Sequence, residues 1–234
     1  MTLEEAIAKI KPLDHNAMEI AQKRWDSIAK PLHSLGKLET LLIQIAGITG
    51  NAEVDLSRRG LIAMCADNGV VEEGVTQTGQ EVTAIVAENF LKYDTSVGVM
   101  CKQNHAEIFP VDMGMVTDTK VRTDHKIAYG TQNMTKGPAM TREQAVKGLE
   151  AGIDMVRELN DKGYRILATG EMGIGNTTTS SAVASVLLKQ PVEEMTGRGA
   201  GLTSEGLVRK INAIKKAIAL NKPDPEDAID VLAK

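Results

Sequence analysis

Apolar residues in the N-terminal part of the chain recur at the spacing of three and four residues that is typical of amphipathic helices. This spacing predicts three helices, over residues 2–10, 14–29 and 35–48. Asp14 and Ser34 lie at the starts of the second and third helix and are predicted N-terminal caps, because their side-chain oxygens accept hydrogen bonds from free helical N–H groups. Residues 1–52 are therefore predicted to form a small N-terminal helical domain.

Beyond residue 52 the pattern changes to short, continuous apolar runs that alternate with longer amphipathic ones. The short runs predict strands over residues 60–66, 106–111 and 164–168. The amphipathic runs predict helices over residues 83–93, 142–162 and 176–189. Strands that alternate with helices form a parallel sheet with helices on both faces, so residues 53–234 are predicted to be a Rossmann-like α/β nucleotide-binding domain.

Acidic residues stand at the ends of the three predicted strands. Asp67, Asp112 and Glu171 each follow an apolar run. In open α/β sheets, ligands bind outside the carboxyl ends of the strands, so these three acids are predicted to share one crevice. The alternative for each Asp is a turn residue that binds its own backbone, which is a common role in Asp-x-Gly sequences.

The third predicted strand leads into a turn that is rich in glycine. Gly170, Gly173 and Gly175 allow a tight turn and a close approach of backbone to a ligand, and a run of small polar residues from Asn176 then opens a helix. The positive end of that helix favours a phosphate. The spacing matches neither the P-loop nor the G-x-G-x-x-G pattern, so the glycines alone fit an ordinary turn equally well. A carboxylate here, that of Glu171, would suit a sugar hydroxyl or a cationic ring better than a phosphate.

Composition and charge exclude several classes of protein. With 27 basic and 31 acidic residues the net charge is −4, which argues against nucleic-acid binding, and there is no polybasic patch for a membrane surface. No apolar run is long enough to span a bilayer and the N-terminus does not resemble a signal peptide, so a cytoplasmic location is expected. Cys65 and Cys101 are predicted to be reduced core thiols, and the four scattered histidines indicate no metal site.

Several motifs occur in an order that carries a family resemblance. They cover residues 30–39, 65–75, 130–134, 137–140, 170–178, 197–199 and 209–211. The series resembles the nicotinate-nucleotide:dimethylbenzimidazole phosphoribosyltransferase family along the whole chain. The resemblance implies transfer of ribose 5-phosphate from nicotinate mononucleotide to 5,6-dimethylbenzimidazole, or a related aromatic base, with inversion at the anomeric carbon. It also implies that no metal or other cofactor is needed, because the leaving group is a pyridinium-type base.

The resemblance also implies roles for individual residues. Gly173, Gly175, Asn176, Thr177, Thr178, Gly199 and Lys210 would bind the phosphate, and Thr78, Val86 and Met172 would contact the incoming base. Glu171 would be the catalytic residue, close to the ribose and the incoming base. Without the resemblance, Lys210 would be interpreted as an exposed lysine of a basic helix.

The chain also departs from the family pattern. Asn68 stands where the family commonly has His, His33 where Gly is usual, and Val86 where a Gln contacts the base. The last change leaves benzimidazole, purine and phenolic acceptors open. The family continues beyond residue 234 through a C-terminal third that supplies further sheet, dimer contacts and a general-base glutamate, so this chain alone is expected to bind substrate without efficient transfer.

Three further expectations concern partners and alternatives. The protein is expected to be a homodimer, or a heterodimer with a paralogue, because the edge of an unfinished sheet invites association. One alternative function is a catalytically silent nucleotide-binding subunit of a hetero-oligomeric homologue that acts on a different base. Another is an α/β oxidoreductase that binds a dinucleotide, and the glycine spacing argues against it.

Overall fold

The computed structural model describes residues 1–234, which form two compact units, residues 2–58 and residues 59–234 with Met1. The first unit contains α1 (Leu3–Ala8), α2 (His15–Ser27) and α3 (Lys37–Thr49). The predicted cap at Asp14 is present, since its carboxylate accepts a hydrogen bond of 2.9 Å from the N–H of Ala17. The predicted cap at Ser34 is wrong. Gly36 is the residue before α3, and the preceding backbone is held by Glu39, which accepts the N–H of Leu35.

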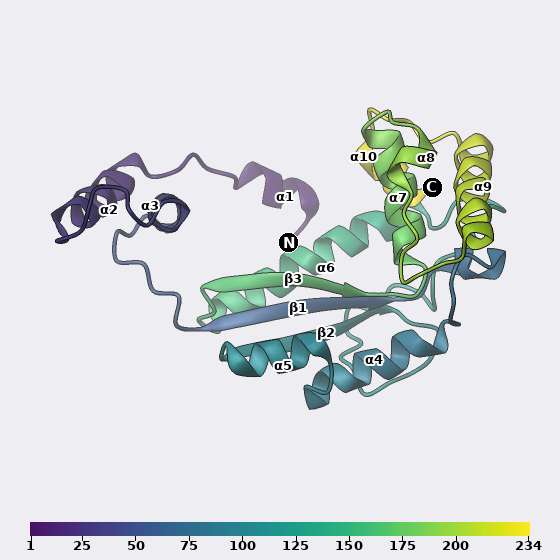
Figure 1. The fold of residues 1–234 in the computed structure, drawn as a ribbon, viewed down its shortest axis with the longest axis horizontal. Coiled ribbons are helices and arrows are strands. Elements are labelled where there is room, and N and C mark those ends of the chain that lie inside the picture. Colours follow the sequence, from purple (N-terminus) through teal and green to yellow (C-terminus); the bar gives the residue numbers. More distant parts are fainter. The chain divides into compact units, whose positions relative to one another are not determined.

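The second unit is built on a three-stranded parallel sheet, which is drawn in Figure 1. Its strands are β1 (Arg59–Ala66), β2 (Ala106–Gly114) and β3 (Ile166–Met172). Their order is β2-β1-β3, with both pairs parallel, so β1 is central and β3 lies at an edge. The prediction of a parallel α/β sheet is confirmed.

Helices cover both faces of this sheet. The side chains of successive residues of a strand point to opposite faces. On one face, Ala63 and Cys65 belong to a buried cluster with Phe90, in α4 (Glu81–Lys92), and Cys101, in α5 (Ser96–Gln103). On the other face, Ile62 belongs to a cluster whose members include residues of α6 (Arg142–Asp161). The two clusters are the two core layers that a parallel sheet requires.

The remaining helices follow the strands at their carboxyl ends (Figure 1). They are the 3-10 helix η1 (Gly69–Glu73), α7 (Asn176–Leu187), α8 (Val192–Met195), α9 (Ser204–Asn221) and α10 (Ala228–Ala233). A third buried cluster joins α9 to the segment around η1 through Ile214, Ala217, Val70 and Val75. This packing places the N-terminus of α7 and the inner face of α9 at the same end of the sheet.

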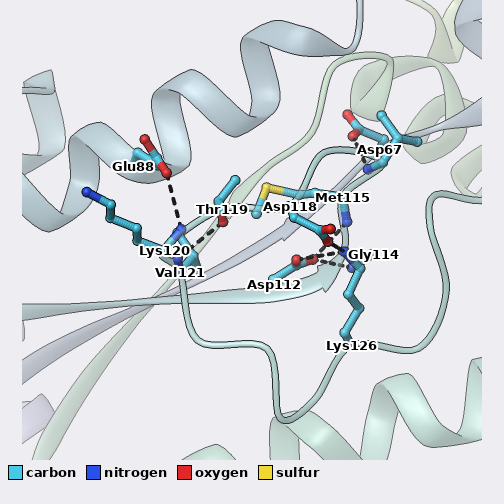
Figure 2. A network of polar contacts seen from close by, with 11 residues as sticks. Asp67, Glu88, Asp112, Gly114, Met115, Asp118, Thr119, Lys120, Val121 and Lys126 are labelled. Atoms are coloured by element: carbon cyan, nitrogen blue, oxygen red, sulfur yellow. Dashed lines mark hydrogen bonds and ion pairs between the residues drawn. The ribbon is translucent and has the colours of Figure 1, made fainter.

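Two of the three acids at the strand ends accept hydrogen bonds from backbone N–H groups (Figure 2). Asp112 lies within β2, and its Oδ1 accepts the N–H groups of Gly114 and Met115 at 2.9 and 2.8 Å. The Oδ2 of Asp67 accepts the N–H of Val116 at 2.8 Å. The prediction that these acids and Glu171 share one crevice is wrong, because the cavity that Asp67 lines contains neither Asp112 nor Glu171.

Both cysteines are free and buried. Burial raises the pKa of the Cys65 thiol to about 12. At neutral pH this thiol therefore stays protonated and is a poor nucleophile. None of the helices combines the length and the apolar character that crossing a bilayer requires.

Candidate functional site

The turn between β3 and α7 requires glycine at two positions. A Cβ atom at Gly173 would overlap the carbonyl oxygen of Ala66, at the end of β1. Gly175, the residue before α7, has a φ angle of +93°, a conformation that residues other than glycine rarely adopt. The backbone of the turn therefore lies directly on the end of β1, and α7 starts immediately after it.

A cavity of about 300 Å³ opens at this turn. Its walls are residues 75–78, residues 172–177 and residues 198–202. Across the cavity, the side-chain amide of Gln77 donates a hydrogen bond of 2.6 Å to the carbonyl of Gly201. None of the lining residues carries a carboxylate, and Arg198 is the one with a full charge. The composition of the walls favours an anionic ligand over a cationic one.

A buried lysine stands behind the turn. Lys210, in α9, is wholly buried, and its Nζ donates to Thr177 Oγ1 at 2.7 Å and to the carbonyl of Gly197 at 3.1 Å. It forms no ion pair with a carboxylate. Burial lowers the pKa of Lys210, because removal from water disfavours the charged ammonium. A buried charge without a counter-ion is costly, so an anion at Thr177 would supply the missing compensation.

The carboxylate of Glu171 is held at the start of α7. The side-chain amide nitrogen of Asn176 donates to both carboxylate oxygens, at 2.7 and 2.8 Å. The oxygen of the same amide accepts the N–H of Thr177 at 2.7 Å. Glu171 itself is exposed. Asn176 thus connects an exposed acid to the first turn of α7.

The structure brings most of the predicted site residues together. Those that line the cavity are Thr78, Met172, Gly173, Gly175, Asn176, Thr177 and Gly199. Lys210 reaches them through Thr177. Thr178 is wholly buried, and its hydroxyl has no hydrogen-bond partner. Val86 packs against the core cluster on one face of the sheet and does not line this cavity.

Other residues of the site were not predicted from the sequence. Arg198 lies in the motif at 197–199, and Gln77 follows the motif at 65–75. The contacts of both residues depend on how two loops meet. Arg198 donates to the carbonyl of Leu202 and to the hydroxyl of Ser204, so it holds its own loop closed. Asn68 and Thr83 contact the glycine turn from behind, and no local pattern indicates this.

Two other cavities of residues 59–234, of about 360 and 490 Å³, are larger but differ in chemistry. The segment 127–140 contributes to both, together with apolar side chains of α6 in the first and of α7, α9 and α10 in the second. Neither contains the Gly173–Gly175 turn or the loop at 198–202. The smaller cavity is therefore the candidate site for an anion.

The lowered pKa of Lys210 predicts how anion binding depends on pH. The charged ammonium attracts an anion and the neutral amine does not, so affinity for inorganic phosphate should fall as the pH rises through this pKa. The fall should begin at a lower pH than it would for an ordinary lysine, whose pKa is 10.5. Titration calorimetry between about pH 8 and 10 measures it.

A matched pair of variants on α9 controls for general charge effects. Lys210→Gln should bind phosphate weakly at every pH. Lys216→Gln removes the same charge from an exposed position of the same helix and should retain the pH profile of the unmodified chain. An affinity that stays constant up to pH 10.5 in the unmodified chain would contradict a titration of Lys210 in this range, and unreduced binding by Lys210→Gln would show that Lys210 does not contact the anion.

The sequence also matches known proteins. A family model described as phosphoribosyltransferase matches residues 10–234. A relative from Ruminiclostridium cellulolyticum is 52% identical over 236 residues, which cover 100% of this chain and 67% of the relative. One from Clostridium tetani is 48% identical over 234 residues, 99% of this chain and 65% of the relative. Both are named nicotinate-nucleotide–dimethylbenzimidazole phosphoribosyltransferase.

Solved structures match the fold as well. The crystal structure of CobT from Thermus thermophilus superposes with a TM-score of 0.84 at 35% sequence identity. The superposition covers 93% of this chain and 66% of that one. The chain therefore spans about two thirds of the length of the relatives and structures that it matches.

Proposed function

Because this chain belongs to the nicotinate-nucleotide–dimethylbenzimidazole phosphoribosyltransferase family, we propose that it acts in the transfer of ribose 5-phosphate from nicotinate mononucleotide to an aromatic base. With 5,6-dimethylbenzimidazole as acceptor, the products are α-ribazole phosphate and nicotinate. The transfer serves the synthesis of the nucleotide loop of cobalamin. The observation that carries the proposal is the buried Lys210 ammonium, which has no carboxylate partner and touches Thr177 at the glycine turn.

The phosphate of the nucleotide occupies the cavity at the start of α7. One of its oxygens replaces the side-chain oxygen of Asn176 on the N–H of Thr177. Lys210 supplies a positive charge beside Thr177, and the partial positive charge at the N-terminus of α7 adds to it. Gly173 and Gly175 let the turn pack closely against Ala66 and Asn68, and Gly199 keeps a side chain away from Thr177 and Lys210. A Cβ atom at Gly199 would lie 2.8 Å from Thr177 Oγ1.

The reaction exchanges one nitrogen for another at the anomeric carbon of the ribose. The bond from this carbon to the nicotinate nitrogen breaks, and its electron pair leaves with the nitrogen, which neutralises the pyridinium charge. A ring nitrogen of the acceptor bonds to the opposite face of the carbon, so the configuration inverts. The other ring nitrogen of the acceptor then loses a proton to a base. Binding both reactants side by side supplies much of the acceleration.

Glu171 acts on the ribose or the acceptor, not on the phosphate, since two anions in contact repel each other. Its carboxylate lies one residue before the cavity wall and is exposed. In this position it stabilises positive charge that develops on the sugar and accepts the proton that the acceptor loses. The acceptor base lies against Thr78 and Met172, which line the cavity.

The protein is further proposed to act in the cytoplasm as a dimer, with itself or with a paralogue. The edge strand β3 supports association, because all of its residues are exposed or half-buried, whereas the strands of parallel sheets are normally buried on both faces. Such an open edge is a template for further strands.

Titration calorimetry with nicotinate mononucleotide and with NAD tests the proposed function. The mononucleotide has a terminal phosphate that fits the start of α7, whereas in NAD this phosphate is esterified to a second nucleotide. Nicotinate mononucleotide should therefore bind more than tenfold tighter, a difference of at least ~1.4 kcal/mol. Tighter binding of NAD would contradict the proposal and favour a dinucleotide enzyme.

A further inference from the structure

The residue at the centre of the glycine turn is held at both of its main-chain groups. The N–H of Ile174 donates a hydrogen bond of 3.1 Å to Thr83 Oγ1, and its carbonyl accepts one of 3.0 Å from the side-chain amide of Asn68. Thr83 lies in α4 and is wholly buried. Asn68 follows the end of β1. Two side chains from distant parts of the sequence thus hold a single peptide segment.

Asn68 also connects the turn to its surroundings. Its backbone carbonyl accepts a hydrogen bond of 3.2 Å from the side chain of Gln80, the residue before α4. Its side-chain oxygen accepts one of 3.4 Å from Thr179, in α7. A Cβ atom at Gly175 would lie 3.1 Å from the Cβ of Asn68, so the turn rests against this side chain.

The turn needs such restraint because glycines flank Ile174 on both sides. Glycine has the largest backbone freedom of all residues, so an unrestrained Gly-Ile-Gly segment would sample many conformations. A ligand that binds one of these conformations must then offset the entropy lost by the others. Two hydrogen bonds to fixed side chains remove this cost before the ligand arrives.

We propose that Thr83 and Asn68 are positioning residues that hold the turn at residues 173–175 in its phosphate-binding conformation. This inference rests on the proposed function, because it takes the nucleotide phosphate as the ligand of the turn. Neither residue lines the cavity, so both act through Ile174. The structural basis is the pair of hydrogen bonds, together with the complete burial of Thr83.

A substitution series at Thr83 tests the inference. Thr83→Val keeps the shape of the side chain but removes the acceptor for the Ile174 N–H, whereas Thr83→Ser keeps the hydroxyl. Ser185→Ala is a matched control, because Ser185 is buried in α7 and its hydroxyl has no partner. Asn68→Asp removes the donor to the Ile174 carbonyl and is a second, independent route in case Thr83→Val does not fold.

Two measurements are made on each protein, hydrogen exchange at the Ile174 amide and affinity for nicotinate mononucleotide and inorganic phosphate. In Thr83→Val, exchange should accelerate and both affinities should fall, each by about tenfold, as expected for a lost buried hydrogen bond. Asn68→Asp should lower both affinities by a similar factor. Thr83→Ser and Ser185→Ala should remain within about threefold of the unmodified chain.

The possible outcomes separate this inference from the function on which it rests. Faster exchange in Thr83→Val with unchanged affinities would overturn the inference, since the restraint would then be structural only. Unchanged exchange would overturn it too, because the hydrogen bond would not hold the turn. Failure of the unmodified chain to bind either probe would overturn the proposed function, and with it the phosphate role of these residues. Exchange at Ile174 would in that case still show whether the side chains restrain the turn.

Discussion

Replacing Gly173 with valine is expected to lower the affinity for nicotinate mononucleotide by well over tenfold, which corresponds to more than ~1.4 kcal/mol. The added Cβ would overlap the carbonyl oxygen of Ala66, a backbone atom of the central strand that cannot move aside as a flexible side chain could. The turn must then lift from the end of β1. This displacement moves the N–H groups at the start of α7 and weakens the contact between Ile174 and Asn68.

Titration calorimetry measures the loss, and circular dichroism verifies that the variant is folded. Gly152→Val is the matched control, because a Cβ at Gly152, in α6, meets nothing within 4 Å. The control should bind the nucleotide as the unmodified chain does. A folded Gly173→Val protein with unreduced affinity would rule out the turn as the phosphate site.

The periodicity of apolar residues predicts the helices and strands in which it is strong, and misses those that are stabilised mainly by tertiary packing. It predicts all three strands, but β2 and β3 continue beyond the predicted ends to Gly114 and Met172. Asp112 and Glu171 suggest strand ends in the sequence, yet parallel pairing continues through both. The short helix α5 is not predicted. Its length of eight residues shows little periodicity, and it is fixed by the Thr95 cap and by packing on β2.

Lys210 illustrates a signal that is present in the sequence but is easily misinterpreted. Composition alone suggests an exposed lysine, because α9 also contains Lys215 and Lys216. Helical spacing, however, places position 210 on the same face as Ala213, Ile214 and Ala217, all of which are buried. A lysine on the apolar face of a helix is unusual and indicates a specific role for its charge.

The restraint of Ile174 could not have been predicted from local patterns. Thr83 and Asn68 lie 91 and 106 positions before Ile174, and only the assembled sheet brings them together. Isolated polar residues of this kind are ordinary in helices and turns. The need for glycine in this turn is easier to predict, because Gly173 and Gly175 are close together in the sequence and indicate a turn. The atom that excludes a side chain at Gly173, the carbonyl oxygen of Ala66, belongs to another strand and is seen only in the structure.

This chain alone is expected to transfer ribose 5-phosphate slowly. No residue that lines the cavity carries a carboxylate, and the nearby Glu171 is held by Asn176. General-base catalysis typically contributes about 10²–10⁴-fold to a rate. We therefore expect this chain to form α-ribazole phosphate about 10²–10⁴ times more slowly than the Ruminiclostridium cellulolyticum relative, of which it covers 67%. Chromatography of the products from nicotinate mononucleotide and dimethylbenzimidazole measures both rates.

The Glu171→Gln variant shows whether Glu171 is the source of any residual rate. An exposed carboxylate close to the acceptor can take its proton, although less effectively than a dedicated general base, so the substitution should lower kcat more than it raises KM. A change in KM alone would make Glu171 a binding residue, and an unchanged rate would make it structural. Equal rates for this chain and the longer relative would place the general base within residues 1–234. Glu171 would then be the first candidate, because Asn176 holds its carboxylate at the start of α7, beside the cavity.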